Sequence, residues 1–64
     1  MDRQQYEDMM YSLGGRLVNA RNHHCPKTAR ARLRDMAKIH AEFRGISYDE
    51  AVGYLSKMYK VEMI

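Results

Sequence analysis

The sequence predicts an all-α fold of three helices, at about residues 3–22, 26–44 and 48–60. Apolar residues recur at intervals of three and four, which is the spacing of one face of a helix. Pro26 and Gly45 stand at positions where helices commonly begin and end. No segment shows the alternation of apolar and polar residues that is typical of a strand.

The first predicted helix carries a one-sided apolar stripe with a coiled-coil-like period. Its members are Tyr6, Met10, Leu13, Leu17 and Ala20. Gly14 and Gly15 lie in the middle of this segment, where each glycine costs about 1 kcal/mol relative to alanine. Two alternatives follow: the helix kinks there, or the missing side chains permit close packing.

The second predicted helix begins at Pro26, because the first turn of a helix tolerates a residue without an N–H group. Its stripe again follows spacings of four and three. The members are Ala29, Leu33, Met36, His40 and Phe43, widened by Ala37 and Ile39. Gly45 then takes the left-handed conformation that commonly ends a helix. His40 is the polar member of the stripe, and we interpret it as a core or interface histidine.

The third predicted helix has the most complete starting signal. Ser47 and Glu50 have the spacing of a capping box, and Ile46 precedes them as a hydrophobic staple. One face of the helix is lined by Tyr48, Val52, Leu55 and Tyr59. The apolar tail at 61–64 either frays or docks on the core.

The chain is expected to form one domain, residues 1–64, with a small core. It has no Trp, one Phe and six Met, and its single cysteine excludes an internal disulfide. Small domains usually need a disulfide, a metal or a partner subunit. We therefore predict an antiparallel helical hairpin plus a third helix, assembled as a homodimeric bundle. The predicted self-association residues are Tyr6, Met10, Leu13, Leu17, Leu33, Met36, His40 and Phe43.

Basic residues concentrate in the centre of the chain. Residues 15–38 hold seven Lys or Arg against the single acidic residue Asp35, and the two flanking segments are mildly acidic. Like charges four residues apart repel along a helix, as in Arg30, Arg34 and Lys38. A partner-binding basic face is therefore predicted at Arg16, Arg21, Lys27, Arg30, Arg34 and Lys38. The alternative is an ordinary solvated face.

No catalytic, metal or cofactor site is predicted. His23, His24 and Cys25 contain metal-ligating groups, but structural zinc requires four ligands and the chain has no second ligand pair. Cys25 precedes a helix start, which favours thiolate, yet no base and oxyanion site accompany it. We expect an incidental helix-capping thiol and no small-molecule substrate.

The cellular compartment is predicted from the cysteine content and the hydropathy. A lone thiol and the absence of a signal-peptide-like apolar run indicate the cytoplasm. Apolar runs are only two or three residues long, whereas a membrane span needs roughly 20. We therefore expect no membrane insertion.

Two long stretches, MMYSLGGRLVNARNHHC and RLRDMAKIHAEFRGISYDEA, resemble the small early-region accessory proteins of lambdoid bacteriophages that are encoded between the exonuclease and excisionase genes. The resemblance covers most of the chain and brings no motif, so it assigns no residue a role. It implies a helical, self-associating protein of the infected bacterial cytosol that adjusts host or phage regulation through binding.

Two functions are weighed. The first is a non-enzymatic interaction protein, a phage accessory regulator that self-associates and modulates a host or phage protein. The second is a small nucleic-acid-binding regulator that uses the basic block at residues 15–38. A helix-turn-helix at 37–54 is disfavoured, because Asp49 and Glu50 would face the phosphates and the presumed recognition helix offers no Arg, Asn or Gln to base edges.

Overall fold

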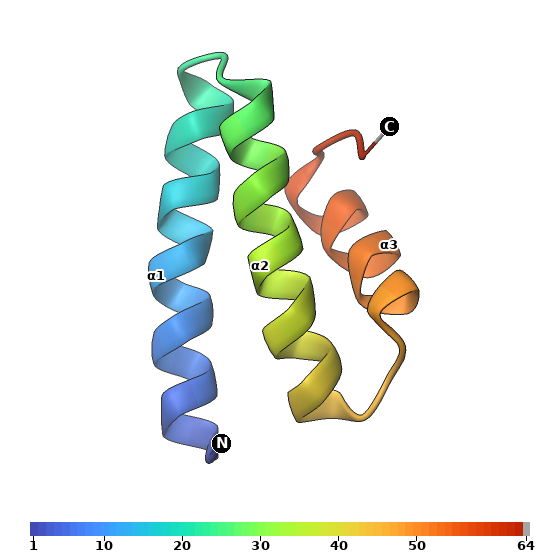
Figure 1. Ribbon diagram of the computed structural model, residues 1–64. Coiled ribbons are helices and arrows are strands. Elements are labelled where there is room, and N and C mark those ends of the chain that lie inside the picture. Colours follow the sequence, from blue (N-terminus) through green and yellow to red (C-terminus); the bar gives the residue numbers. More distant parts are fainter. Residues whose placement is uncertain (64) are drawn as a thin grey trace.

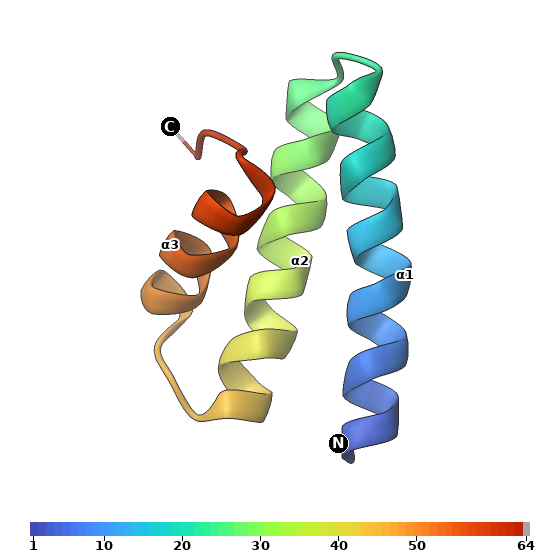
Figure 2. The same cartoon turned by 180° about the vertical axis from the view of Figure 1, so that it is seen from behind.

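The computed structural model describes residues 1–63, which fold into three helices (Figures 1 and 2). Helix α1 spans Arg3–Asn22, α2 spans Pro26–Arg44 and α3 spans Tyr48–Tyr59. The predicted all-α class and the bounds of the first two helices are confirmed. The third helix ends one residue earlier than predicted.

Helix α2 lies between the other two helices in both views (Figures 1 and 2). It forms an antiparallel hairpin with α1, and α3 runs back along it at a tilt (Figure 1). Helix α2 contacts both neighbours extensively, whereas α1 and α3 touch only sparingly. The Cα atoms extend over 33 × 22 × 15 Å, so the helices form a thin layer with two broad faces.

Helix α1 begins with a complete capping box that was not predicted from the sequence. The Asp2 carboxylate accepts from the Gln5 N–H over 2.8 Å, and the Gln5 side chain accepts from the Asp2 N–H over 3.1 Å. The pair satisfies two backbone donors that no helical carbonyl reaches. An Asp–Gln pair fits the chemistry of a capping box as well as the Ser–Glu pair that predicted the start of α3.

Helix α1 runs without interruption through Gly14 and Gly15, so the glycines do not break it. A Cβ atom on Gly14 would lie 2.9 Å from the hydroxyl oxygen of Tyr59 in α3. Gly14 therefore permits close packing, which was the second of the two alternatives. Apart from its chain neighbours and the backbone of its own helix, no atom of residues 1–63 lies within 4 Å of the corresponding position on Gly15, so no packing contact among these residues requires a glycine there.

The turn between α2 and α3 follows the predicted signals in part. Gly45 has the left-handed conformation, with φ of 69°, and its N–H bonds to the Ala41 carbonyl. Ser47 accepts from the Glu50 N–H over 3.0 Å, but Glu50 does not return the bond, so only half of the predicted capping box forms. One cap bond is enough to start the helix.

The core is small and almost entirely aliphatic. Its buried members are Leu17, Ala20, Ala29, Leu33, Met36, Ala37, Ala51, Leu55 and Val61. Val61 follows the left-handed Lys60 and is buried, so the tail docks at this residue. Ile64, the last residue of the predicted tail, lies outside the described residues.

Candidate interaction surfaces

Four basic residues of α2 share one side of the helix. Lys27, Arg30, Arg34 and Lys38 follow intervals of three and four residues, which places them within one helical face. Arg30 is half-buried and the other three are exposed. We call these four residues the basic strip. The ion pairs among residues 1–63 are Arg3–Glu7 and Arg32–Asp35, so the strip has no acidic partner within the described chain.

The two remaining members of the predicted basic face lie elsewhere. Arg16 and Arg21 are five residues apart, which separates them by about 140° around α1. Arg16 shares a recess of about 300 Å³ with Arg32 and His23, between α1 and α2. Arg21 donates to the Tyr59 carbonyl over 2.8 Å and so helps attach α3. The predicted set of six thus divides into one strip and two separate arginines.

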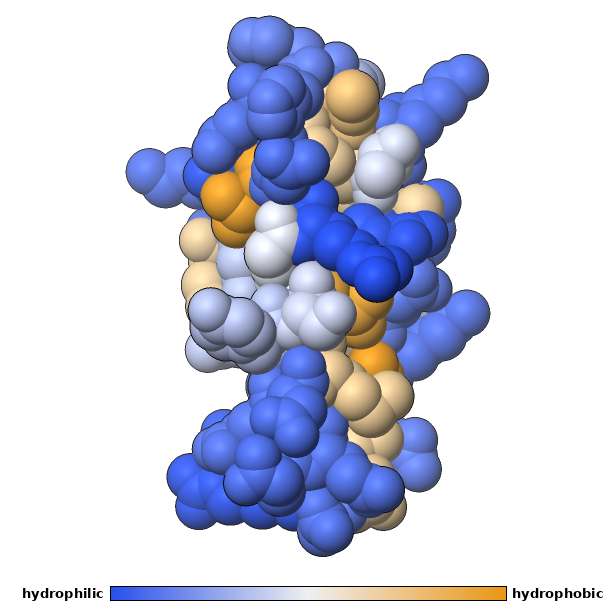
Figure 3. Space-filling view, turned by 90° about the vertical axis from the view of Figure 1, so that its left-hand side faces the viewer, coloured by the Kyte–Doolittle hydropathy of each residue, from blue (hydrophilic) through white to orange (hydrophobic). Residues whose placement is uncertain are grey.

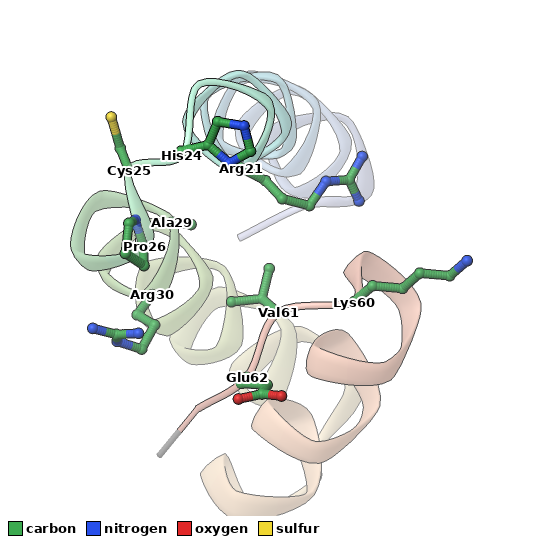
Figure 4. A pocket seen from close by; sticks show the side chains of 9 residues that line it. All are labelled: Arg21, His24, Cys25, Pro26, Ala29, Arg30, Lys60, Val61 and Glu62. Atoms are coloured by element: carbon green, nitrogen blue, oxygen red, sulfur yellow. The ribbon is translucent and has the colours of Figure 1, made fainter.

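A second basic region surrounds a recess of about 440 Å³ at the end of the hairpin (Figure 4). Val61 lies at its centre, and the charged ends of Arg30 and Lys60 point away from each other on opposite sides (Figure 4). Glu62 adds a carboxylate to the lining. Since its cations do not converge, the recess does not form a focused anion site.

The histidine and cysteine residues of the hairpin turn are engaged locally. Nδ1 of His23 forms a hydrogen bond with the Asn19 carbonyl over 2.8 Å. Cys25 is exposed and sits at the N-cap of α2 without a side-chain capping bond, and its thiol lies 3.7 Å from the His23 carbonyl. Within residues 1–63, no three His, Cys, Asp or Glu side chains gather closely enough to hold a metal.

The predicted self-association stripes pack mainly inside a single chain. Leu17, Leu33 and Met36 are fully buried between the helices, so a second chain cannot contact them without opening the core. The half-buried members, which keep some accessible surface, are Tyr6, Met10, Leu13 and Phe43. The two stripes face each other across the hairpin, and α3 covers a further part of α2.

His40 joins all three helices at the end of the molecule that holds the N-terminus. It is 8% exposed, its Nδ1 and the Tyr6 hydroxyl form a hydrogen bond over 2.7 Å, and its ring stacks on Tyr54 with centroids 5.4 Å apart. Tyr6 also stacks on Phe43, with centroids 4.0 Å apart. Burial lowers the pKa of His40 below its ordinary value, and the nearby Arg44 cation lowers it further.

Three uncharged residues of α1 lie off the buried stripe of the helix. Tyr11 is 87% exposed, and Gly15 and Val18 follow it at intervals of four and three residues. We call Tyr11, Gly15 and Val18 the α1 face. A shallow recess of about 400 Å³ borders it, also lined by Met10, Gly14 and Tyr59, with no acidic or basic side chain. Figure 3 shows pale, weakly polar residues at mid-height, with strongly hydrophilic residues above, below and beside them.

The α1 face was not among the predicted surfaces, although its signal is present in the sequence. Tyr11 and Val18 lie off the stripe that packs on α2, and a glycine between them has no stabilising role in a helix. In the sequence alone the two adjacent glycines are indistinguishable. In the structure the two glycines differ. A Cβ atom on Gly14 would lie against the Tyr59 hydroxyl, whereas a Cβ atom on Gly15 would contact no side chain of residues 1–63.

Comparison of the chain with protein-family models, with curated proteins and with solved structures gives no match. None of the three helices found in residues 1–63 has the length and apolar character to cross a bilayer.

Proposed function

We propose that this protein is a non-enzymatic interaction protein, which self-associates and uses the basic strip to dock on an acidic surface of a protein partner. The observation that carries the proposal is the row of four unpaired cations on α2. Aligned like charges destabilise a helix slightly, and an acidic partner relieves that repulsion. A strip made only for solubility would gain from interspersed acidic residues.

Protein is favoured over nucleic acid by the extent and the surroundings of the strip. From Lys27 to Lys38 the strip rises about 16 Å along the helix axis, at 1.5 Å per residue. Glu42 is exposed one turn beyond Lys38, and Glu62 lines the recess that includes Arg30, so carboxylates stand near both ends. An acidic patch on a protein can be confined to the length between these carboxylates, whereas a phosphate backbone continues past both ends of the strip and meets them unfavourably.

Nucleic-acid binding is the second candidate, because the strip alone could follow a few phosphates. Such binding would be nonspecific, since the strip holds no Asn or Gln suited to base edges. Its affinity would fall steeply with rising salt.

The non-enzymatic part of the proposal is supported by the surroundings of the most nucleophilic side chain. The hydrogen-bond partner of the Cys25 thiol is a backbone carbonyl, and the imidazole of His23 is occupied by the Asn19 carbonyl. An activated nucleophile requires a base within hydrogen-bond reach.

The resemblance to early-region phage proteins suggests the setting of this function. We propose a cytoplasmic regulator that modulates a host or phage protein. The small size and the helical fold of the chain agree with that class. The cytoplasmic setting also agrees with a free, exposed thiol.

Charge reversal on the strip tests the proposal. Immobilised wild-type chain is expected to retain a partner from bacterial lysate in stoichiometric amount, and Arg34→Glu/Lys38→Glu is expected to lose it. Arg3→Glu/Lys57→Glu is the matched control, because it changes the net charge equally at exposed positions outside the strip. Equal retention by both variants would contradict docking through the strip.

A gel shift at low salt separates the two candidates. The wild-type chain is expected to leave a DNA duplex unretarded. Retardation that Arg34→Glu/Lys38→Glu abolishes and that weakens with salt would replace the protein partner by nucleic acid.

A further inference from the structure

Two arginines from different helices line the recess of about 300 Å³ between α1 and α2, which we call the arginine recess. Arg16 and Arg32 stand at the same level along the hairpin, since each lies eight residues from His24 in the turn. Among residues 1–63, none of those that line the recess is acidic. Its polar members are Arg16, Asn19, His23, Cys25, Thr28 and Arg32. The fold therefore places two like charges at one recess, with no carboxylate in its lining.

The arginine recess lies apart from the other contacts of the two helices. Arg16 and Gly14 are two residues apart and so point about 160° apart around α1. Gly14 faces Tyr59, which places the recess on the other side of α1 from α3. Arg32 and Arg34 also point about 160° apart, around α2. The recess and the basic strip therefore lie on different sides of the hairpin, and a ligand of one leaves the other free.

The guanidinium of Arg32 has unused hydrogen-bond donors among residues 1–63. Its Nε atom is buried and has no hydrogen-bond partner. A terminal nitrogen lies 3.6 Å from a carboxylate oxygen of Asp35, which is an ion-pair contact too long for a hydrogen bond. Buried polar groups normally have partners, and an unpaired donor costs free energy. The side chain is 32% exposed, so its remaining donors can meet a ligand.

The cation on the facing helix is also without an acidic partner. Arg16 is exposed, and it is absent from the two ion pairs of residues 1–63. Two guanidinium groups at one recess repel each other, and a bound anion removes that repulsion. The same repulsion acts on a metal cation, so the neighbouring thiol and imidazole of the recess are poorly placed to hold one. The recess is therefore suited to an anion.

The arrangement of donors indicates a phosphate group. Arg16 belongs to α1 and Arg32 to α2, and the Asn19 amide and the Thr28 hydroxyl add neutral donors from the same two helices. Guanidinium groups bind phosphate and carboxylate oxygens through paired N–H donors. The oxygens of a phosphate point in several directions and can accept from both helices at once. The two oxygens of a carboxylate lie in one plane and suit a single guanidinium.

The neutral residues of the recess limit the ligand to one phosphate. Asn19 and Thr28 occupy the level between the arginines and the turn, so the two arginines stand at one level only. A nucleic-acid strand carries a charge at every nucleotide and is held by cations spaced along it. We propose that the arginine recess binds the single phosphate group of a small molecule, as inorganic phosphate or as a phosphate monoester. This ligand is independent of the protein partner proposed for the basic strip.

Titration of the full chain with inorganic phosphate tests the site, with sodium chloride holding the ionic strength constant. Amide-resolved NMR spectroscopy is expected to show saturable shifts centred on Asn19, Thr28 and Arg32. The basic strip is expected to shift little. Shifts that do not saturate, or shifts centred on the strip, would overturn the proposal.

Arg16→Gln removes one of the two cations at an exposed position, where the fold is expected to stay intact. The dissociation constant for phosphate is expected to rise at least about tenfold, as for the loss of a charge-assisted hydrogen bond. Arg3→Gln is the matched control, because it removes the same charge from an exposed arginine of the same helix. The control is expected to bind phosphate like the wild type. Equal weakening by both variants would show a general charge effect and contradict the site.

Arg32→Gln tests the second cation, and circular dichroism checks its helices. The same rise in the dissociation constant is expected. If this variant does not fold, Arg16→Gln still decides the proposal, because Arg16 makes no ion pair within residues 1–63.

Adenosine monophosphate and a single-stranded oligonucleotide identify the source of the phosphate. Tighter binding of the monophosphate than of inorganic phosphate would indicate an ester, and the reverse order would indicate the free anion. Either order supports a phosphate in the recess if Arg16→Gln weakens the binding. Binding of the oligonucleotide alone would overturn the small-molecule ligand in favour of nucleic acid.

Discussion

The two ends of the three-helix layer hold α1 and α3 together by different means. At the closed end, Gly14 receives the Tyr59 ring, Arg21 donates to the Tyr59 carbonyl and Val61 is buried. At the open end, the half-buried Tyr6 bonds to His40, and the ring of His40 stacks on the exposed Tyr54. The closed end depends on close packing, and the open end depends on a polar aromatic bridge.

This difference shows how a thin domain distributes its stability. Aliphatic burial at the closed end is insensitive to pH and intolerant of changes in volume. The bridge at the open end includes a titratable ring, and part of its surface is in water. Substitutions and pH changes are therefore expected to affect the two ends differently.

The largest effect is expected from the core of the closed end. Leu55→Ala removes a fully buried side chain of α3, and such truncations cost about 2–5 kcal/mol. That loss approaches the whole stability of a domain of this size. Urea denaturation followed by circular dichroism measures it. Met58→Ala is the control, because Met58 is half-exposed and lies three residues after Leu55 on α3. A loss equal for both variants would contradict the assignment of the core.

The two adjacent glycines provide a sharper comparison. Gly15→Ala is expected to raise the free energy of unfolding by about 0.5–1 kcal/mol, which is the usual helix-propensity gain. Gly14→Ala is expected to raise the free energy of unfolding by less than Gly15→Ala does, since the new methyl group displaces the Tyr59 hydroxyl. Denaturation at low protein concentration measures both variants as single chains. Equal gains would show that Tyr59 moves away without cost.

The smallest effect on the free energy of unfolding is expected at the open end, and only at acidic pH. Burial and Arg44 lower the pKa of His40 in the folded state, so the unfolded chain binds more protons as the pH falls. The contribution of neutral His40 is complete above pH 6.5 and is lost progressively as the pH falls from that value toward the lowered folded pKa.

Comparison of the wild type with His40→Gln between pH 7 and pH 5 isolates this contribution, because the other titrating groups are common to both. The free energy of unfolding of the wild type is expected to fall more steeply with decreasing pH. The matched control is His23→Gln, at an exposed histidine of the hairpin turn. Parallel curves for all three proteins would contradict the role of His40.

Much of this fold could be predicted because its signals are local. The apolar spacing in α1 and α2, Pro26 at a helix start and Gly45 in the left-handed turn all act within a few residues. The capping box of α1 is equally local, since Asp2 and Gln5 have the same spacing as Ser47 and Glu50. The basic strip could also be predicted, since helical periodicity alone places its four members on one side.

The sequence by itself determined three helices, their ends and the side of α2 on which the cations stand, because hydrogen bonds and periodicity within a helix depend on neighbouring residues. The tertiary structure alone decided that Arg21 serves α3, that Leu17 and Leu33 are unavailable to a second chain, and that Gly14 and Gly15 differ. These facts depend on where α3 packs, and that position arises from contacts between residues far apart in the chain.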